Sequence, residues 1–175
     1  TVGDKAFDQA GLTSLVLPDS ITELGDNAFN NNWYLASLSI GAGIQTIPDY
    51  CFGKMGRRSE TGVTDFTIPG TVTAIEYGAF YNFGNAVAPT SVTIEYGVNS
   101  IGSAAFQDAK VAEVDIPGSV TVISSHAFWS CSLLNTVAIP HGVQRITSRA
   151  FEGTGLAAGA VIVLPETVTY LGDSA

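Results

Sequence analysis

The sequence predicts a repeat solenoid, a fold in which short coils of chain stack on one another and form parallel β-sheets. Three observations predict it: an Ala-Phe string that recurs along the chain, a short strand-like string between successive copies, and a fixed step that follows each strand. No single coil of this size can bury its apolar side chains, whereas stacked copies share a continuous core. We therefore expect one array over residues 1–175.

The Ala-Phe string anchors each repeat. It ends at Phe7, Phe29, Phe52, Phe80, Phe106, Phe128 and Phe151, and a truncated eighth copy stops at Ala175. The intervals between anchors are 22, 23, 28, 26, 22 and 23 residues, which predicts about seven repeats of 22–28 residues. Each Phe is expected to fill the core at the back of its coil, and the Ala before it to let neighbouring coils approach.

Two extended segments are expected in each repeat. The first reads apolar, variable, apolar, stop, at 15–18, 38–41, 66–69, 92–95, 114–117, 137–140 and 162–165. An apolar–x–x–apolar step follows, as at Ile21 and Leu24, and its spacing never varies. Alternation with β-branched residues favours strands. Because parallel strands lie about 4.8 Å apart, the array should be a rod roughly 30 Å long.

The residue three places before each Phe is nearly always Asp or Ser, with Tyr77 as the exception. The set is Asp4, Asp26, Asp49, Ser103, Ser125, Ser148 and Asp173. Asp and Ser are favoured at helix N-caps, so we expect each to cap a single helical or 3-10 turn that carries the Ala-Phe pair. A calcium ion bridging the three aspartates is the alternative. Capping also explains the serines, so no metal site is predicted.

The repeat resembles a known family. LTSLVLPDSITELGDNAF (12–29) and VAEVDIPGSVTVISSHAF (111–128) match the BspA-like leucine-rich repeat almost position for position, and Cys131 falls where that repeat often has cysteine. The resemblance covers essentially the whole chain and departs from the family in insertions after Phe52, Phe80 and Phe151. It implies a leucine-rich-repeat solenoid, an extracellular or cell-surface location, a role in adhesion or partner binding, and no catalytic residues.

Composition excludes several classes of function. The formal charge is −9, from seven Lys plus Arg and sixteen Asp plus Glu, so a basic face for nucleic acid or an anionic membrane is not expected. No apolar run reaches the roughly 20 residues that span a bilayer. Phosphate, nucleophile and zinc motifs are missing from the sequence, so neither a cofactor nor an enzyme is predicted. Cys51 and Cys131 lie three repeats apart, roughly 14 Å, too far for a disulfide.

Aromatic residues after the Phe anchors are the first candidates for ligand binding, because aromatic edges can fill a partner's pocket or stack on sugars. They are Trp33, Tyr34, Tyr81, Phe83 and Trp129. The alternative is that they pack the back of the coil. The outward positions of the first strands are small or hydroxylated, which makes that face a poor high-affinity anchor.

The insertion at 53–62 supplies the second group of candidates. Lys54, Arg57 and Arg58 are three of the seven basic residues, and long insertions in repeat arrays are often functional. They can pair with an acidic partner, or the insertion can be a flexible, solvated loop. A second insertion, at 82–91, has no charged group.

Two roles agree with these features. The first is a binding or adhesion module for a protein or glycan; the second is a structural segment of an extracellular rod or filament that stacks end to end on further copies. The chain begins and ends inside a repeat, and arrays normally carry caps, so we expect it to be a fragment of a longer array.

Overall fold

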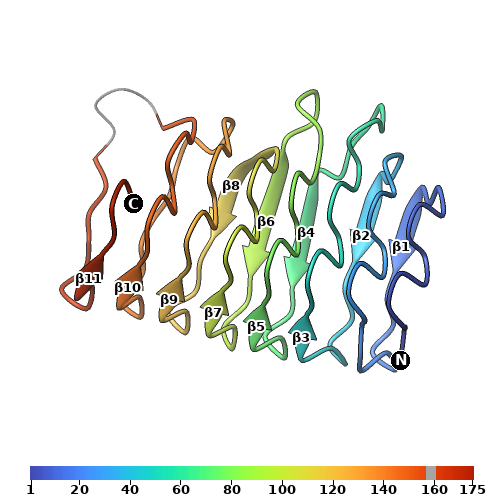
Figure 1. The fold of residues 1–175 in the computed structure, drawn as a ribbon, viewed down its shortest axis with the longest axis horizontal. Coiled ribbons are helices and arrows are strands. Elements are labelled where there is room, and N and C mark those ends of the chain that lie inside the picture. Colours follow the sequence, from blue (N-terminus) through green and yellow to red (C-terminus); the bar gives the residue numbers. More distant parts are fainter. Residues whose placement is uncertain (157–160) are drawn as a thin grey trace.

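The computed structural model describes residues 1–156 and 161–175. This part of the chain winds into stacked coils with eleven short strands (Figure 1). They are β1 (Ser14–Val16), β2 (Ser37–Ser39), β3 (Thr46–Ile47), β4 (Asp65–Ile68), β5 (Ala74–Ile75), β6 (Thr90–Ile94), β7 (Ser100–Ile101), β8 (Val111–Asp115), β9 (Val122–Ile123), β10 (Arg145–Ile146) and β11 (Tyr170–Leu171).

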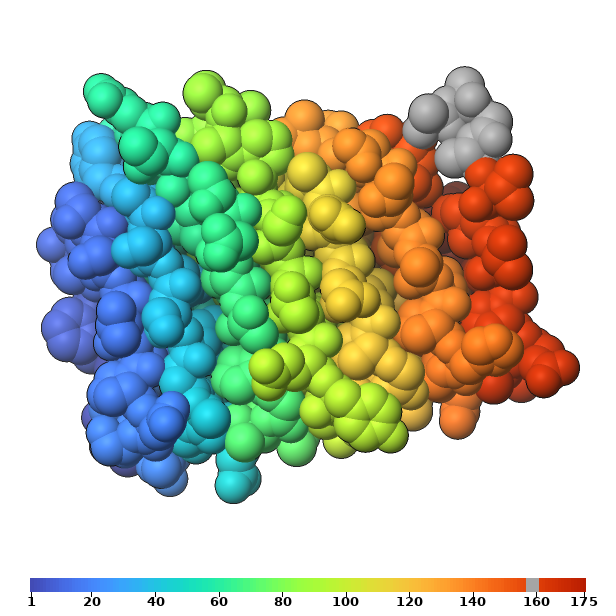
Figure 2. All heavy atoms as spheres, turned by 180° about the vertical axis from the view of Figure 1, so that it is seen from behind, coloured from blue at the N-terminus to red at the C-terminus, as the bar shows by residue number. Residues whose placement is uncertain are grey.

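The strands form two rows, and every pairing is parallel. The first row contains the pair β1–β2 and the three-stranded sheet β4–β6–β8. The second row is a six-stranded sheet in the order β3–β5–β7–β9–β10–β11, which lines the lower edge of Figure 1. Its register advances by one coil at each step, so that Ile47 pairs with Ile75 and Ile75 with Ile101. Seen from behind, the coils follow one another along the long axis as neighbouring bands (Figure 2).

The anchor phenylalanines form one interior column, as predicted. Neighbouring rings are stacked with centroids 5.4, 5.8, 5.3, 5.0, 5.2 and 5.2 Å apart from Phe7 to Phe151. Phe52, Phe80, Phe106 and Phe128 are fully buried, whereas Phe7 in the first coil is 45% exposed. This column gives each coil apolar partners above and below it.

A second interior column lies three residues after each of the five anchors from Phe29 to Phe128. Its members Asn32, Met55, Phe83, Ala109 and Cys131 are all buried. Asn32 is the polar member: its Nδ2 donates to the carbonyl oxygens of Phe7 (2.9 Å) and Phe29 (2.7 Å), and its Oδ1 accepts the Leu12 N–H (3.0 Å). Hydrogen bonding of all three groups makes a buried amide tolerable in an otherwise apolar column.

The segment that carries Ala-Phe is a series of tight turns, and none of the described residues is helical. In the fifth coil, the N–H groups of Ala104, Phe106 and Asp108 donate to carbonyl oxygens of the next coil, at 3.0, 2.8 and 2.8 Å. The intervening N–H groups of Ala105 and Gln107 donate back within their own coil, at 3.3 and 3.0 Å. Each N–H of the turn is thereby satisfied without a helix.

Left-handed backbone conformations make this alternation possible. The residue two places before the anchor has positive φ in every repeat: Lys5, Asn27, Tyr50, Gly78, Ala104, His126, Arg149 and Ser174. A left-handed L-residue costs roughly 1–2 kcal/mol, and the hydrogen bonds to the neighbouring coil offset this cost. The predicted helical or 3-10 turn is therefore wrong, because a helix would direct these N–H groups along its own chain.

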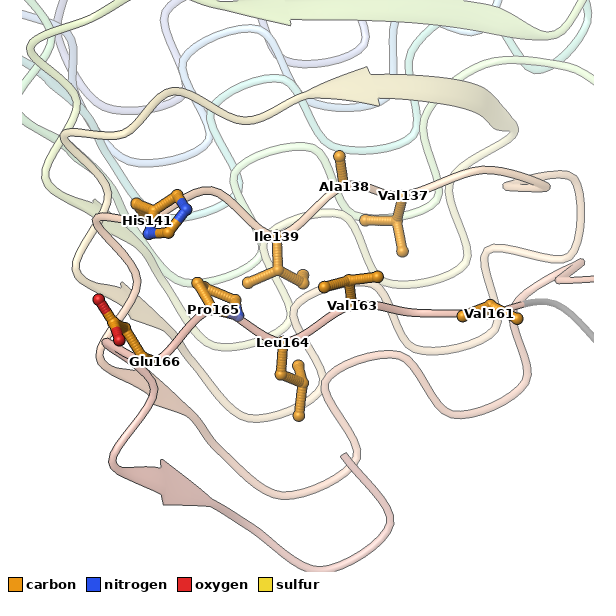
Figure 3. A pocket seen from close by; sticks show the side chains of 9 residues that line it. All are labelled: Val137, Ala138, Ile139, His141, Val161, Val163, Leu164, Pro165 and Glu166. Carbon is orange, nitrogen blue, oxygen red and sulfur yellow. The ribbon is translucent and has the colours of Figure 1, made fainter.

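The first row of strands ends earlier than predicted. Segments 137–140 and 162–165 are not strands, and beyond β8 the row continues only as an isolated bridge between Glu113 and Thr136. A groove of about 650 Å³ separates the two segments, with Ile139 and Val163 among its lining residues (Figure 3). Strand pairing requires a spacing near 4.8 Å, so an open groove excludes a ladder between them.

Truncation of an interior ring should destabilise the array far more than truncation of the outermost one. Phe106→Ala removes a fully buried ring that stacks on two neighbours, so we expect a loss of about 3–5 kcal/mol in the free energy of unfolding. The matched control is Phe7→Ala, with one stacking partner and a half-exposed ring, for which we expect about 1 kcal/mol. Urea unfolding followed by circular dichroism measures both, and equal losses would contradict the shared-core description.

Candidate functional site

The side chains that vary most between coils lie on the outside of the turns. We call this surface the turn face and define it by the residues three and two places before each anchor Phe and one place after it. The backbone of these residues holds the coils together. Most of their side chains are at least partly exposed. Aromatic residues on the turn face gather in two groups, one in the third and fourth coils and one in the sixth.

The first group consists of three tyrosines. The Tyr50 ring meets Tyr77 edge-to-face with centroids 5.3 Å apart, and meets Tyr81 in the same way at 5.9 Å. The neighbouring Tyr77 hydroxyl, together with partial burial, raises the pKa of Tyr50 to about 12. The Tyr50 hydroxyl therefore stays protonated at physiological pH. The edge-to-face contacts hold the three rings together as one aromatic surface. The structure thus brings the predicted residue Tyr81 together with two tyrosines that were not among the predicted site residues.

The second group consists of His126 and Trp129. Their rings meet edge-to-face with centroids 5.8 Å apart, and Trp129 is half-buried. On the next coil, Arg149 Nε lies 3.5 Å from Glu152 Oε2 in an exposed ion pair. The two groups are separated by the fifth coil, which carries short side chains at Ser103 and Ala104.

Trp33 lies apart from both groups and contacts the first insertion. The Arg58 guanidinium lies over the Trp33 ring, 4.5 Å from its centroid, and the Arg58 N–H donates to the Trp33 carbonyl oxygen at 2.8 Å. Cation–π contacts of this kind contribute roughly 0.5–1 kcal/mol at exposed sites. Arg57 is exposed, Lys54 is partly exposed, and Tyr34 is 50% exposed. The predicted residues thus form one neighbourhood around Trp33 and a second around Tyr81, with Trp129 two coils further on.

The insertion at 53–62 is packed against the body of the protein. Met55 is fully buried, Ser59 is 7% exposed, and the Asn85 side-chain amide of the second insertion donates to the Ser59 carbonyl oxygen. The Gly84 N–H also donates to the Met55 carbonyl oxygen at 2.9 Å. The insertion is therefore tied to the second insertion rather than extended freely into solvent, while Arg57, Arg58 and Glu60 on it stay exposed.

Phe83 does not belong to any exposed site. It is 1% exposed and packs against Phe66 and Phe80, with ring centroids 5.3 and 5.7 Å away. Its prediction as a ligand-binding residue is wrong, and the alternative, packing at the back of the coil, is correct for this residue. The signal was present in the sequence: Phe83 follows its anchor by three residues, as do the buried Met55 and Cys131.

Two of the aspartates before the anchors, Asp4 and Asp49, contact the backbone of the next coil. Asp4 Oδ1 accepts the Asp26 N–H at 3.0 Å, and Asp49 Oδ1 accepts the Tyr77 N–H at 3.1 Å. They are caps between coils rather than caps of helical turns. Among residues 1–156 and 161–175, no group of three His, Cys, Asp or Glu side chains is arranged to hold a metal ion.

Both cysteines are buried and free, as small apolar residues should be. Cys131 Sγ donates to the Phe106 carbonyl oxygen at 2.9 Å. Burial raises the pKa of Cys131 to about 12, and burial also raises the pKa of Cys51. Thiolate chemistry at either position is therefore suppressed in the folded protein.

Comparison with known proteins agrees with this geometry. The sequence profile of the BspA type leucine-rich repeat region matches residues 1–59 and 58–175, with six copies in all. The chain belongs to the BspA-type leucine-rich repeat family. The predicted family and solenoid class are thereby confirmed. None of the curated proteins matches the chain.

Solved structures of other leucine-rich repeat proteins have a similar fold. A leucine-rich repeat protein from Bacteroides ovatus matches with 22% identity and a TM-score of 0.79, over 99% of this chain and 43% of that one. A leucine-rich cell surface protein from Faecalibacterium prausnitzii matches with 29% identity and a TM-score of 0.66, over 98% and 42%. The BspA-type array described here therefore spans less than half the length of these proteins.

No helix among the described residues has the length and apolar character needed to cross a bilayer. The roles of Trp33, Tyr34, Tyr81, Trp129, Lys54, Arg57 and Arg58 in ligand binding stay predictions.

Removal of one inter-coil cap should distinguish capping from metal binding. Asp49→Ala deletes the acceptor for the Tyr77 N–H, so we expect a loss of about 1 kcal/mol in unfolding free energy. Asp49→Asn keeps an acceptor oxygen and should recover most of that loss. Urea unfolding with and without calcium chloride provides the measurement. A stabilisation by calcium that disappears in Asp49→Ala would instead favour the cation site.

Buried thiols should make the protein less stable at alkaline pH. The folded Cys131 stays protonated until about pH 12, whereas an unfolded cysteine loses its proton near pH 8.5, so unfolding releases a proton above that pH. The stabilisation is fully present below about pH 8.5 and declines as the pH rises toward 12. Between about pH 9 and 11, the unfolding free energy of Cys131→Ala should fall with pH less steeply than that of the parent protein, by about 1.4 kcal/mol per pH unit. Identical pH slopes in urea unfolding would contradict the assignment.

Proposed function

We propose that the chain is a non-catalytic binding module of a cell-surface or secreted protein, and that it presents the aromatic side chains of its turn face, together with Trp33, to a glycan or protein partner. The observation that carries the proposal is a set of partly exposed aromatic side chains that are held in place: those of the turn face contact one another, and Trp33, outside the turn face, is covered by Arg58. Rigid aromatic and arginine side chains are enriched among residues that dominate binding energy.

The other long surface offers much less. First-row strands present small and hydroxylated side chains outward, including Ser14, Ser37, Ser39 and Thr67, all exposed. Such a surface lacks the large side chains that fill a partner's pockets. Contact through the turn face therefore agrees better with a binding role than contact through the strands.

The comparisons support this proposal at the level of the family. The matched structures are leucine-rich repeat proteins, and the one from Faecalibacterium prausnitzii is described as a cell surface protein. The net charge of this chain, −9, disfavours a nucleic acid as the partner, because phosphates bind to basic surfaces.

A binding screen against immobilised glycans and host extracellular proteins tests the function. For a ligand that binds, we expect Trp33→Ala or Trp129→Ala to weaken the affinity at least about tenfold, because truncation removes a large contact surface. Val16→Ala is the matched control, since Val16 is 71% exposed on the strand face. Loss of affinity in the Val16 variant alone would show that the ligand binds the strand face instead.

Light scattering on the same samples tests the second role. End-to-end association of the purified protein, with no ligand found in the screen, would favour the structural segment of a rod or filament over the binding module.

A further inference from the structure

A shallow depression of about 300 Å³ interrupts the turn face at the fifth coil. Its lining includes Ser103 and the buried Ala104 of the fifth coil, which we call its floor. Tyr77 of the preceding coil and Trp129 of the following coil also line it. We call it the coil-5 depression. Its volume is at the lower end of the roughly 300–1,000 Å³ range of small-molecule clefts.

The depression exists because of one short side chain. Two places before the anchor, the third coil has Tyr50, and its ring covers Gly78 of the next coil so closely that a Cβ on Gly78 would lie 2.7 Å from Tyr50 Cε1. In the fifth coil the same position is Ala104, whose methyl group leaves the space between the flanking aromatics open. The sixth coil fills the position again with His126.

The two aromatic sides are held in place before any ligand binds. Tyr77 is 45% exposed and is supported edge-to-face by Tyr50, while Trp129 is supported by His126. They belong to the fourth and sixth coils, so two strand spacings, about 10 Å, separate them. Support of this kind reduces the ordering cost that binding must overcome.

Polar groups on the floor and rim offer both donors and acceptors. Ser103 and Ser125 contribute hydroxyl groups. Gln107 contributes an amide whose Nε2 donates to Asp108 Oδ2 at 3.3 Å, and its carbonyl oxygen, which accepts no hydrogen bond from the described residues, is an acceptor for a ligand. Arg149 pairs with Glu152 through its Nε, and the other N–H groups of its guanidinium are further donors. A ligand rich in hydroxyl groups matches this mixture, because each hydroxyl both donates and accepts.

Charge and depth narrow the ligand class further. The chain carries −9, and Arg149 at the rim is already paired with Glu152, so an acidic ligand gains little there. A peptide anchor needs a deep apolar pocket, whereas this floor is a methyl group between hydroxyls. The C–H face of a pyranose ring, by contrast, packs on the electron-rich face of Tyr or Trp.

We propose that the coil-5 depression binds a neutral, pyranose-containing oligosaccharide, with Tyr77 and Trp129 against the sugar rings and Gln107, Ser103 and Arg149 on its hydroxyl groups. The proposal rests on the binding function proposed above and assigns it a site and a ligand class.

Isothermal titration of the full chain with neutral cello-, manno- and galacto-oligosaccharides tests the proposal. Ala104→Lys fills the depression, and the backbone tolerates lysine there because Lys5 adopts the same positive φ at the equivalent position. For an oligosaccharide that binds, Ala104→Lys and Trp129→Ala should each lower the affinity at least tenfold. Asn27→Lys, with the same charge change at the equivalent position of the second coil, should retain the parent affinity.

Several outcomes would overturn the proposal while leaving the binding function intact. One is binding of a ligand that depends on Trp33 and is unchanged in Ala104→Lys. Another is tighter binding of an acidic probe, a hyaluronan hexasaccharide, than of any neutral one. A third is binding of protein ligands with no neutral oligosaccharide bound. Absence of any ligand in both the titrations and the screen would overturn the proposal and the binding function together. Thermal melts of each variant establish that a lost affinity does not come from unfolding.

Discussion

The stacking of each coil on its neighbours at one strand spacing is the constraint on which the rest of this structure depends. Interior Phe rings lie 5.0–5.8 Å apart, close to the spacing of paired strands. A coil of about two dozen residues cannot surround its own Phe, so it is stable only between two others. The same spacing determines the pairing of Ile75, Ile101 and Ile123 along the second row.

The turns show how the backbone meets this constraint without regular helices. Alternate N–H groups must reach the next coil, and left-handed residues direct them there. Since the backbone supplies these bonds, side chains as different as Lys5, Tyr50, Ala104 and Arg149 occupy equivalent positions. The turn face can therefore change its chemistry from coil to coil while the core repeats, which is the property expected of a binding surface in a repeat protein.

Sequence reasoning succeeded where the signal repeats and failed where it does not. The Phe column, the family and the burial of both cysteines followed from the repeat. The helical turn was wrong because Asp and Ser also cap the N–H groups of a neighbouring coil, as Asp49 does, and sequence preference does not distinguish these partners. The packing of the first insertion was not predicted, because the bond between Asn85 and Ser59 joins two insertions, and neither insertion reveals it alone. The sequence also did not show that the first row of strands ends at β8, because segments 137–140 and 162–165 carry the same strand-like pattern as the earlier repeats.

The sequence by itself determined the coil, its length, the interior Phe column and the hydroxyl-rich strand face, because these features come from local patterns that recur in every repeat. Only the tertiary structure decided which surface side chains meet: that Arg58 covers Trp33, that Phe83 turns inward, and that Tyr77 and Trp129 flank the same depression. These contacts depend on how side chains of different coils are aligned after insertions of unequal length. Each contact involves two coils, so the pattern within a single repeat does not predict it.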